Sequence, residues 1–270
     1  MNVTVPQDQL FLYEKVKLLS MKDDTGLQLG YDMMNPAAYS IVGAVQMDLL
    51  LGGWIRFDAD KKCIVNHEKE PPTDAVLQAA LARIKKKKKP QKAKDIILML
   101  AVYEHPERAA IKNLIDKGMV RLEKTGGFFS RKRYPLDNIK RKAEIISSLR
   151  NVLRSEEKAA PLETLILFRL THSAKILPYL FKVEYNHDLD ALQRDIQKAL
   201  AKVVIDDGVD AALQEQERRE EMFDALSTTL DVLTISIDAI TDAVDSTTDA
   251  SGGDGGDGGG GGDGGGGGGD

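Results

Sequence analysis

The sequence lacks the residue patterns that build most metal and catalytic sites. A single cysteine, Cys63, rules out a disulfide within the chain. The four histidines are far apart and form no HxxxH or Cys/His pattern of the kind that binds zinc. No GxGxxG follows a predicted strand, and neither a GxxxxGK[ST] phosphate loop nor a GxSxG nucleophile motif occurs. We therefore expect no metal, no cofactor and no enzymatic activity.

Long apolar runs are missing too. No stretch approaches the ~20 consecutive apolar residues that a membrane-spanning helix needs, and residues 1–9 have neither the basic start nor the apolar run of a signal peptide. We therefore expect a cytoplasmic protein. Hydrophobic residues still make up 42 % of the 270 residues, which is enough for a core and for one or two domains.

The charges are distributed unevenly along the chain. Residues 206–270 hold 17 acidic and 2 basic side chains, whereas residues 1–205 hold 25 acidic and 35 basic side chains. The overall charge of −5 therefore combines a segment of net −15 with a domain of net +10. A domain with that charge attracts anionic partners such as lipid headgroups or nucleic acid. The acidic segment is able to compete for the same surface.

Hydrophobic periodicity predicts a mainly α domain with two β-hairpins. The predicted helices cover residues 10–19, 33–51, 75–84, 93–103, 109–117, 139–153, 162–181 and 189–204. Predicted strands at 54–58 and 62–66 form the first hairpin, and strands at 119–122 and 128–134 form the second. Thr73 or Asp74 is the expected N-cap of the helix that begins at residue 75.

Beyond residue 205 the sequence consists of two segments with different compositions. Residues 206–248 are predicted to form an acidic helix, because apolar residues recur at alternating spacings of three and four. These residues are Phe223, Leu226, Leu230, Leu233, Ile237, Ile240 and Val244. Residues 249–270 are glycine and aspartate apart from Ala250 and Ser251, which predicts a disordered tail. The heptads fit a coiled coil with another chain or docking on the chain's own domain, and the sequence leaves both open.

Six short segments between residues 9 and 204 form an ordered set of motifs. They are LL at 18–19 with KDDTG at 22–26, GAVQMDLLLGGWI at 43–55, PTD at 72–74 with VL at 76–77 and AL at 80–81, NLIDKGMV at 113–120, RYPL at 133–136, and LTHS at 170–173. In this order they resemble the Golgi phosphoprotein 3 family, including its bacterial relatives. The resemblance covers nearly the whole of residues 1–205, which we treat as one domain.

The resemblance implies a mostly helical fold with β-hairpins and a peripheral membrane protein that recognises phosphatidylinositol 4-phosphate. In eukaryotic members that lipid implies recruitment to the cytosolic face of the Golgi and an adaptor role for resident enzymes. The family's lipid pocket uses a tryptophan, an arginine and two further basic residues. In an ungapped comparison these positions fall on Met33, Val42, Glu104 and Glu107, none of which is basic or aromatic. The resemblance therefore assigns no lipid-binding residue in this chain.

The basic residues of the sequence indicate a candidate binding site independently of the family resemblance. The five consecutive lysines at 85–89 are the strongest electrostatic feature, since each lysine near an anionic membrane contributes about 1 kcal/mol. Arginine adds bidentate contacts to phosphate. The candidate lipid-binding residues are Arg108, Lys112, Arg121, Arg131, Arg133, Lys85, Lys86 and Lys87. Trp54 fits either a membrane wedge or an anchor of the first hairpin, and we favour the anchor.

The features together favour a peripheral membrane module that binds anionic phospholipid headgroups, with phosphatidylinositol 4-phosphate among them. One alternative is a nucleic-acid-binding winged helix, because a helix followed by a hairpin occurs twice. The helix predicted at 33–51 is nearly all apolar, which makes it a poor recognition helix. A further alternative is a structural homo-oligomer held together by the heptads.

Overall fold

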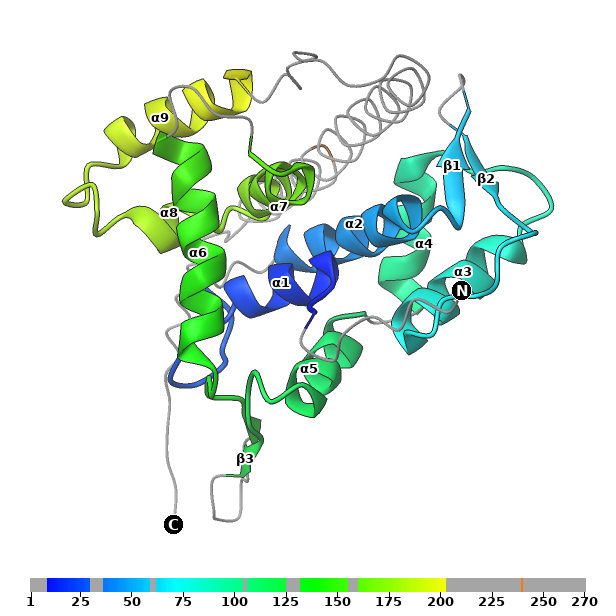
Figure 1. The fold of residues 1–270 in the computed structure, drawn as a ribbon, viewed down its shortest axis with the longest axis horizontal. Helices are drawn as coiled ribbons and strands as arrows, with labels where there is room; N and C mark the ends of the chain where they lie inside the picture. Colours follow the sequence, from blue (N-terminus) through cyan, green and yellow to red (C-terminus); the bar gives the residue numbers. More distant parts are fainter. Residues whose placement is uncertain are drawn as a thin grey trace, which may run out of the picture.

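The computed structural model describes residues 9–29, 36–58, 62–103, 106–124, 132–154 and 160–202, together with residue 239 (Figure 1). The acidic helix predicted at 206–248 lies outside these residues except for Ala239, and the tail predicted at 249–270 lies wholly outside them. The described helices and strands therefore belong to the basic domain, residues 1–205.

Within the described ranges the chain is mainly helical, as the sequence predicts. The helices are α1 (Leu12–Leu19), α2 (Pro36–Leu51), α3 (Ala75–Lys85), α4 (Ala93–Tyr103), α5 (Pro106–Asp116), α6 (Ile139–Arg154), α7 (Leu162–Ser173), α8 (Leu177–Phe181) and α9 (Leu189–Lys202). Two antiparallel hairpins join them, β1 (Ile55–Phe57) with β2 (Cys63–Val65), and β3 (Glu123–Lys124) with β4 (Lys132–Arg133). The predicted fold class is confirmed.

Helix α2 is the centre of the core. Its sequence is apolar on all sides, and twelve of its sixteen residues are buried, because α1, α4 and α7 pack around it (Figure 1). A helix without a polar face gains most from burial on every side. Among the polar side chains that α2 brings into the core, Gln46 donates a hydrogen bond from its side-chain amide to the carbonyl of Ala93, 3.1 Å away, and so fixes the start of α4.

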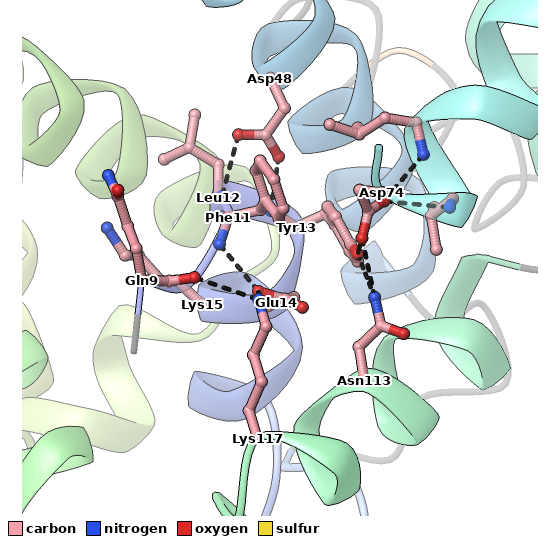
Figure 2. A network of polar contacts seen from close by, with 12 residues as sticks. Gln9, Phe11, Leu12, Tyr13, Glu14, Lys15, Asp48, Asp74, Asn113 and Lys117 are labelled. Carbon is pink, nitrogen blue, oxygen red and sulfur yellow. Dashed lines mark hydrogen bonds and ion pairs between the residues drawn. The ribbon is translucent and has the colours of Figure 1, made fainter. Parts of the chain in front are cut away.

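Asp48 of α2 holds the first turn of α1 (Figure 2). Its two carboxyl oxygens accept hydrogen bonds from the backbone N–H groups of Leu12 and Tyr13, at 3.0 and 3.1 Å. The first N–H groups of a helix have no partner within the helix, so a buried helix start needs such an acceptor. Burial raises the pKa of Asp48 to about 8, against the opposing effect of the two backbone hydrogen bonds.

Tyr13 joins three helices through its hydroxyl group. It donates to Asp74 Oδ2 at 2.9 Å and accepts from the side-chain amide of Asn113 at 2.6 Å. Burial raises the pKa of Tyr13, which keeps the phenol protonated and able to donate. Asp74 also accepts from the backbone N–H groups at the start of α3, so Asp74 is the N-cap that the sequence predicted as one of two candidates. Figure 2 shows α1, α3 and α5 meeting at this point.

Lys117 ties the end of α5 to the start of α1. Its ammonium group lies 2.6 Å from the carboxylate of Glu14, whose side chain is fully buried. The same group donates to the carbonyl of Gln9 at 3.1 Å and lies 5.0 Å from the ring centroid of Phe11. A buried carboxylate without a cation is costly, so this contact fixes where α5 lies.

Two predicted elements were wrong in detail. The helix predicted at 162–181 is divided into α7 and α8, because Lys175 has a φ of 56° and Pro178 opens α8. Proline lacks the N–H that a continuous helix would use and disfavours helical geometry in the residue before it. The strand predicted to begin at 119–122 is present as an irregular antiparallel pairing, a bridge between Val120 and Leu136 and a hydrogen bond from Arg121 N–H to the carbonyl of Pro135, and the regular strand β3 begins at Glu123. Its first residue also closes α5, because Met119 donates its N–H to the carbonyl of Leu114 and Gly118 has a φ of 65°.

We expect replacement of Asp48 with asparagine to change how stability depends on pH. The raised pKa means that folded Asp48 keeps its proton between pH 3.8 and about 8, whereas unfolded Asp48 releases it. Its stabilising contribution is therefore present at low pH and is lost as the pH rises, by up to about 1.4 kcal/mol per pH unit. Urea denaturation at pH 5 and pH 8 should show a larger loss of stability for the wild type than for Asp48→Asn. Equal losses in the two proteins would contradict this assignment.

We also expect Asn113→Ala to destabilise the domain by about 1–2 kcal/mol, because Tyr13 and Asp74 then lose a shared donor in a partly buried site. Lys112→Ala is the matched control on the same helix. Lys112 is exposed, and its loss should cost less than about 0.5 kcal/mol. Thermal denaturation of both variants measures the difference, and equal midpoints would show that the Tyr13 hydroxyl does not join the helices.

Candidate anion-binding surface

The lysine run lies at the end of α3 and in the loop that leads to α4. All five side chains from Lys85 to Lys89 are exposed, and within the described part of the chain none of them forms an ion pair. Arg83 and Lys85 end the helix, where positive charge interacts favourably with the helix dipole. The five ammonium groups are therefore available to an anionic partner.

The first hairpin holds this loop in place. Cys63 of β2 donates its backbone N–H to the carbonyl of Gln91 at 2.8 Å, and Lys62 and Lys92 form an antiparallel bridge. Figure 1 shows the segment between α3 and α4 running beside β2. The loop therefore follows the hairpin as a short additional strand, although its lysines alone gave no sign of such pairing.

Two further lysines extend the run. Lys92 and Lys94 are both exposed, and Asp95 is the one acidic residue in the sequence between residues 83 and 103. We call Lys85–Lys89, Lys92 and Lys94 the lysine surface. Sequence reasoning singled out the five lysines of the run and named three of them as candidate binding residues, but it omitted Lys92 and Lys94, although their closeness to the run was a sufficient signal.

Trp54 anchors the first hairpin, as the favoured interpretation expected. Its ring is partly buried against the core, and its Nε1 donates to the carbonyl of Glu70 at 2.7 Å. The ammonium group of Lys69 lies 5.0 Å from the ring centroid. The ring also occupies the space next to Gly52, where a Cβ atom would lie 2.0 Å from a ring carbon. Glycine is needed there because the ring packs against the backbone.

The second hairpin offers less unpaired charge than the sequence suggested. Arg121 pairs with both Asp137 and Glu123, the latter at 2.9 Å. The hydrogen bond to Asp137 raises the pKa of the Arg121 guanidinium most, and the hydrogen bond to Glu123 raises it further. Arg133 lies opposite Glu123 in the strand register, and Arg131 lies outside the described residues. The carboxylates of this hairpin therefore compete with any phosphate.

The candidate residues form separate groups in space. Arg108 and Lys112 are exposed one turn apart on α5, while Lys85, Lys86 and Lys87 lie at the other end of α3 from the point where Asp74 meets α5. Figure 1 shows β3 far from the β1–β2 hairpin and its neighbouring loop. The structure therefore does not bring the eight candidates together, and the lysine surface is the densest unpaired group among the residues that the structure describes.

The four positions that correspond to the family's lipid pocket do not form a binding site among the described residues. Val42 is buried in α2. Glu107 pairs with Lys17 of α1 at 2.9 Å, and Lys17 is only 5 % exposed. Met33 and Glu104 lie outside the described residues. A lysine from within the domain thus already neutralises Glu107. The signal for it in the sequence was Lys17 between apolar neighbours, in the segment Val16–Leu19 of the predicted helix at 10–19.

Comparisons with known proteins agree with this helical fold. A scan against protein families matches residues 12–218 to Golgi phosphoprotein 3 (GPP34), and a comparison with curated proteins finds no match. In the part of the chain that the structure describes, no helix combines the length and the apolar character needed to cross a bilayer. The family match extends over most of the chain and contains the helices α1 to α9 and both hairpins. The chain therefore belongs to the Golgi phosphoprotein 3 family.

Proposed function

We propose that this protein is a peripheral membrane-binding module, without enzymatic activity, that attaches to anionic phospholipid headgroups through the lysine surface. The observation that carries the proposal is the run of five exposed lysines with no ion pair among the described residues. Membership of the Golgi phosphoprotein 3 family supports membrane association. Phosphatidylinositol 4-phosphate is among the headgroups that such a surface attracts, and an adaptor role at the cytosolic face of the Golgi follows if the source is eukaryotic.

The strength of this attraction is sufficient for reversible binding. Each lysine close to an anionic bilayer contributes about 1 kcal/mol, so five lysines supply about 5 kcal/mol, or a partition coefficient raised by three to four orders of magnitude. The effect acts within a Debye length of about 8–10 Å at physiological salt. Binding should therefore weaken steeply when the salt concentration rises.

Charge rather than headgroup identity is what this surface recognises. Specific phosphate sites combine arginine forks with buried donors, whereas the lysine surface consists of exposed ammonium groups on flexible stems. The one described acidic position of the family pocket, Glu107, already has a cation as its partner. We therefore propose that vesicles of equal negative charge bind equally well whichever headgroup carries the charge.

Nucleic-acid binding is the weaker alternative. A winged helix needs a recognition helix whose polar face is exposed ahead of the hairpin. Helix α2 precedes the first hairpin and is buried along most of its length, so it has no face to place in a groove. Helix α5 precedes the second hairpin, where Arg121 is already paired with two carboxylates.

Replacing three lysines of the run should remove most of the binding. We expect the full-length variant Lys86→Gln/Lys87→Gln/Lys88→Gln to bind phosphatidylserine vesicles about 100-fold more weakly in co-sedimentation, since about 3 kcal/mol is lost. The matched control is Lys124→Gln/Lys132→Gln/Arg133→Gln, which removes three exposed charges from the second hairpin. The control should stay within about threefold of the wild type, because its charges lie away from the proposed contact.

Equal losses in the two variants would contradict the assignment of the surface, and wild-type binding by the lysine variant would overturn it. A second arm compares vesicles of matched charge that contain phosphatidylserine or phosphatidylinositol 4-phosphate. Equal binding is expected. A preference for the phosphoinositide that survives the lysine substitutions would show that a headgroup pocket, and not the lysine surface, makes the contact.

A further inference from the structure

Helix α4 exposes two large apolar side chains to water. Leu98 is 39 % exposed and Val102 is 63 % exposed, and their spacing of four residues places them one turn apart on the side of the helix that also carries Lys94. The other side of α4 is buried, and the helix packs on α2 and α3. We call Lys94, Leu98 and Val102 the outer face of α4. Covering its apolar area would be favourable.

The outer face of α4 is continuous with the lysine surface. Lys94 belongs to both, Lys92 lies directly before the helix, and the lysine run ends four residues before it. The five lysines of the run form no ion pair among the described residues. A partner that covers Leu98 and Val102 therefore meets unpaired positive charge at the start of the same helix.

Asp95 is the acidic residue on this side of α4. It is exposed in the first turn, where its carboxylate interacts favourably with the helix dipole. It lies directly beside Lys94 in the sequence, and the lysine surface outnumbers it by seven charges to one. Val102 follows seven residues later, about 10 Å along the helix axis. The single carboxylate therefore leaves the surface strongly basic and lies away from the most exposed apolar side chain.

An anionic bilayer matches both properties of this surface. Its headgroups attract lysines, and the boundary between its headgroups and acyl chains receives the apolar side chains of a helix that lies along it. A second copy of the chain fits less well, because pairing two outer faces would bring two lysine surfaces together. Charge complementarity thus favours a lipid surface over self-association.

A second exposed apolar pair shows why the charge matters. Tyr179 and Val183 are also four residues apart and exposed, at the end of α8. Their neighbours carry both signs of charge, with Lys182 close to Glu184 and Asp188 in the sequence. An anionic bilayer gains little attraction at such a place. Exposed apolar side chains and unpaired lysines occur together at α4.

We propose that the outer face of α4 is the apolar part of the membrane contact, in which Leu98 and Val102 insert between the lipids while the lysine surface holds the headgroups. This inference rests on the proposed function. Helix α4 then lies along the bilayer surface as an interfacial amphipathic helix. Salt screens the contribution of the lysines but not that of the inserted side chains.

Vesicle binding by a variant that removes only the apolar side chains tests the insertion. We expect full-length Leu98→Gln/Val102→Gln to bind phosphatidylserine vesicles about tenfold more weakly than the wild type, because two apolar side chains no longer leave water. Its affinity should fall with salt as steeply as that of the wild type, since no charge has changed. The lysine variant Lys86→Gln/Lys87→Gln/Lys88→Gln should instead show a shallower dependence on salt.

The matched control is Val183→Gln/Leu189→Gln, which removes two apolar side chains that are 69 % and 55 % exposed near α8 and α9. It should bind as the wild type does. Equal weakening in the control and the α4 variant would overturn the insertion, and so would wild-type binding by the α4 variant. Thermal denaturation checks that both variants remain folded.

A label at position 102 reports the insertion without removing Leu98. Because the native Cys63 is buried, a cysteine introduced as Val102→Cys takes a fluorescent dye, and Val183→Cys is the comparison. With vesicles whose acyl chains carry a quencher, we expect quenching at position 102 and none at position 183. An unquenched label at position 102 on vesicle-bound protein would overturn the insertion.

The two measurements separate the insertion from the proposed function. If the lysine variant binds weakly but the label at position 102 stays unquenched in the bound protein, the insertion fails and the proposed function stands. If the label is quenched while the lysine variant binds as the wild type does, the proposed function fails and the insertion stands. Absence of vesicle binding overturns both. A change in the label that needs no vesicles and grows with protein concentration would assign the face to a second copy and overturn the insertion.

Discussion

The arrangement of the domain depends on the contact between Asp48 and the first turn of α1. Its two hydrogen bonds, to Leu12 and Tyr13, fix the position of α1 on the central helix α2. That position directs the Tyr13 hydroxyl toward Asp74 and so toward the start of α3. The far end of α3 then presents the lysine run. A carboxyl group in the core, that of Asp48, thus determines, through two helices, where the positive charge of the surface lies.

The domain uses its cations in two distinct ways. Lys17 and Lys117 pair with Glu107 and Glu14 within the fold, where they neutralise carboxylates that would be costly to bury alone. The lysine surface carries its charge outside, on a loop held against the first hairpin. The net charge of the domain does not distinguish lysines that neutralise buried carboxylates from lysines that are exposed at the surface. The contrast explains why the same excess of basic residues gives a stable core and also a surface that attracts anions.

The sequence predicted those features that depend on neighbouring residues. The bounds of α4, the Asp74 cap and the exposed lysine run follow from local periodicity and composition. The sequence did not predict features that depend on the backbone conformation of one residue or on contacts between residues far apart in the chain. The break between α7 and α8 depends on a left-handed Lys175, and the pairing of Lys17 with Glu107 joins positions 90 residues apart. The eight candidate residues could not be sorted from the sequence, because it gives no distance between the lysine run and the second hairpin.

A fluorescent label on the lysine surface tests the central claim most directly. Burial raises the pKa of the one native cysteine, Cys63, to about 12, so its thiol stays protonated and unreactive. A cysteine introduced as Lys88→Cys can therefore carry an environment-sensitive dye, with Lys124→Cys on the second hairpin for comparison. With phosphatidylserine vesicles at low salt, we predict a blue-shifted emission at position 88 and no change at position 124. A shift at position 124 alone would place the membrane contact on the second hairpin and contradict the account.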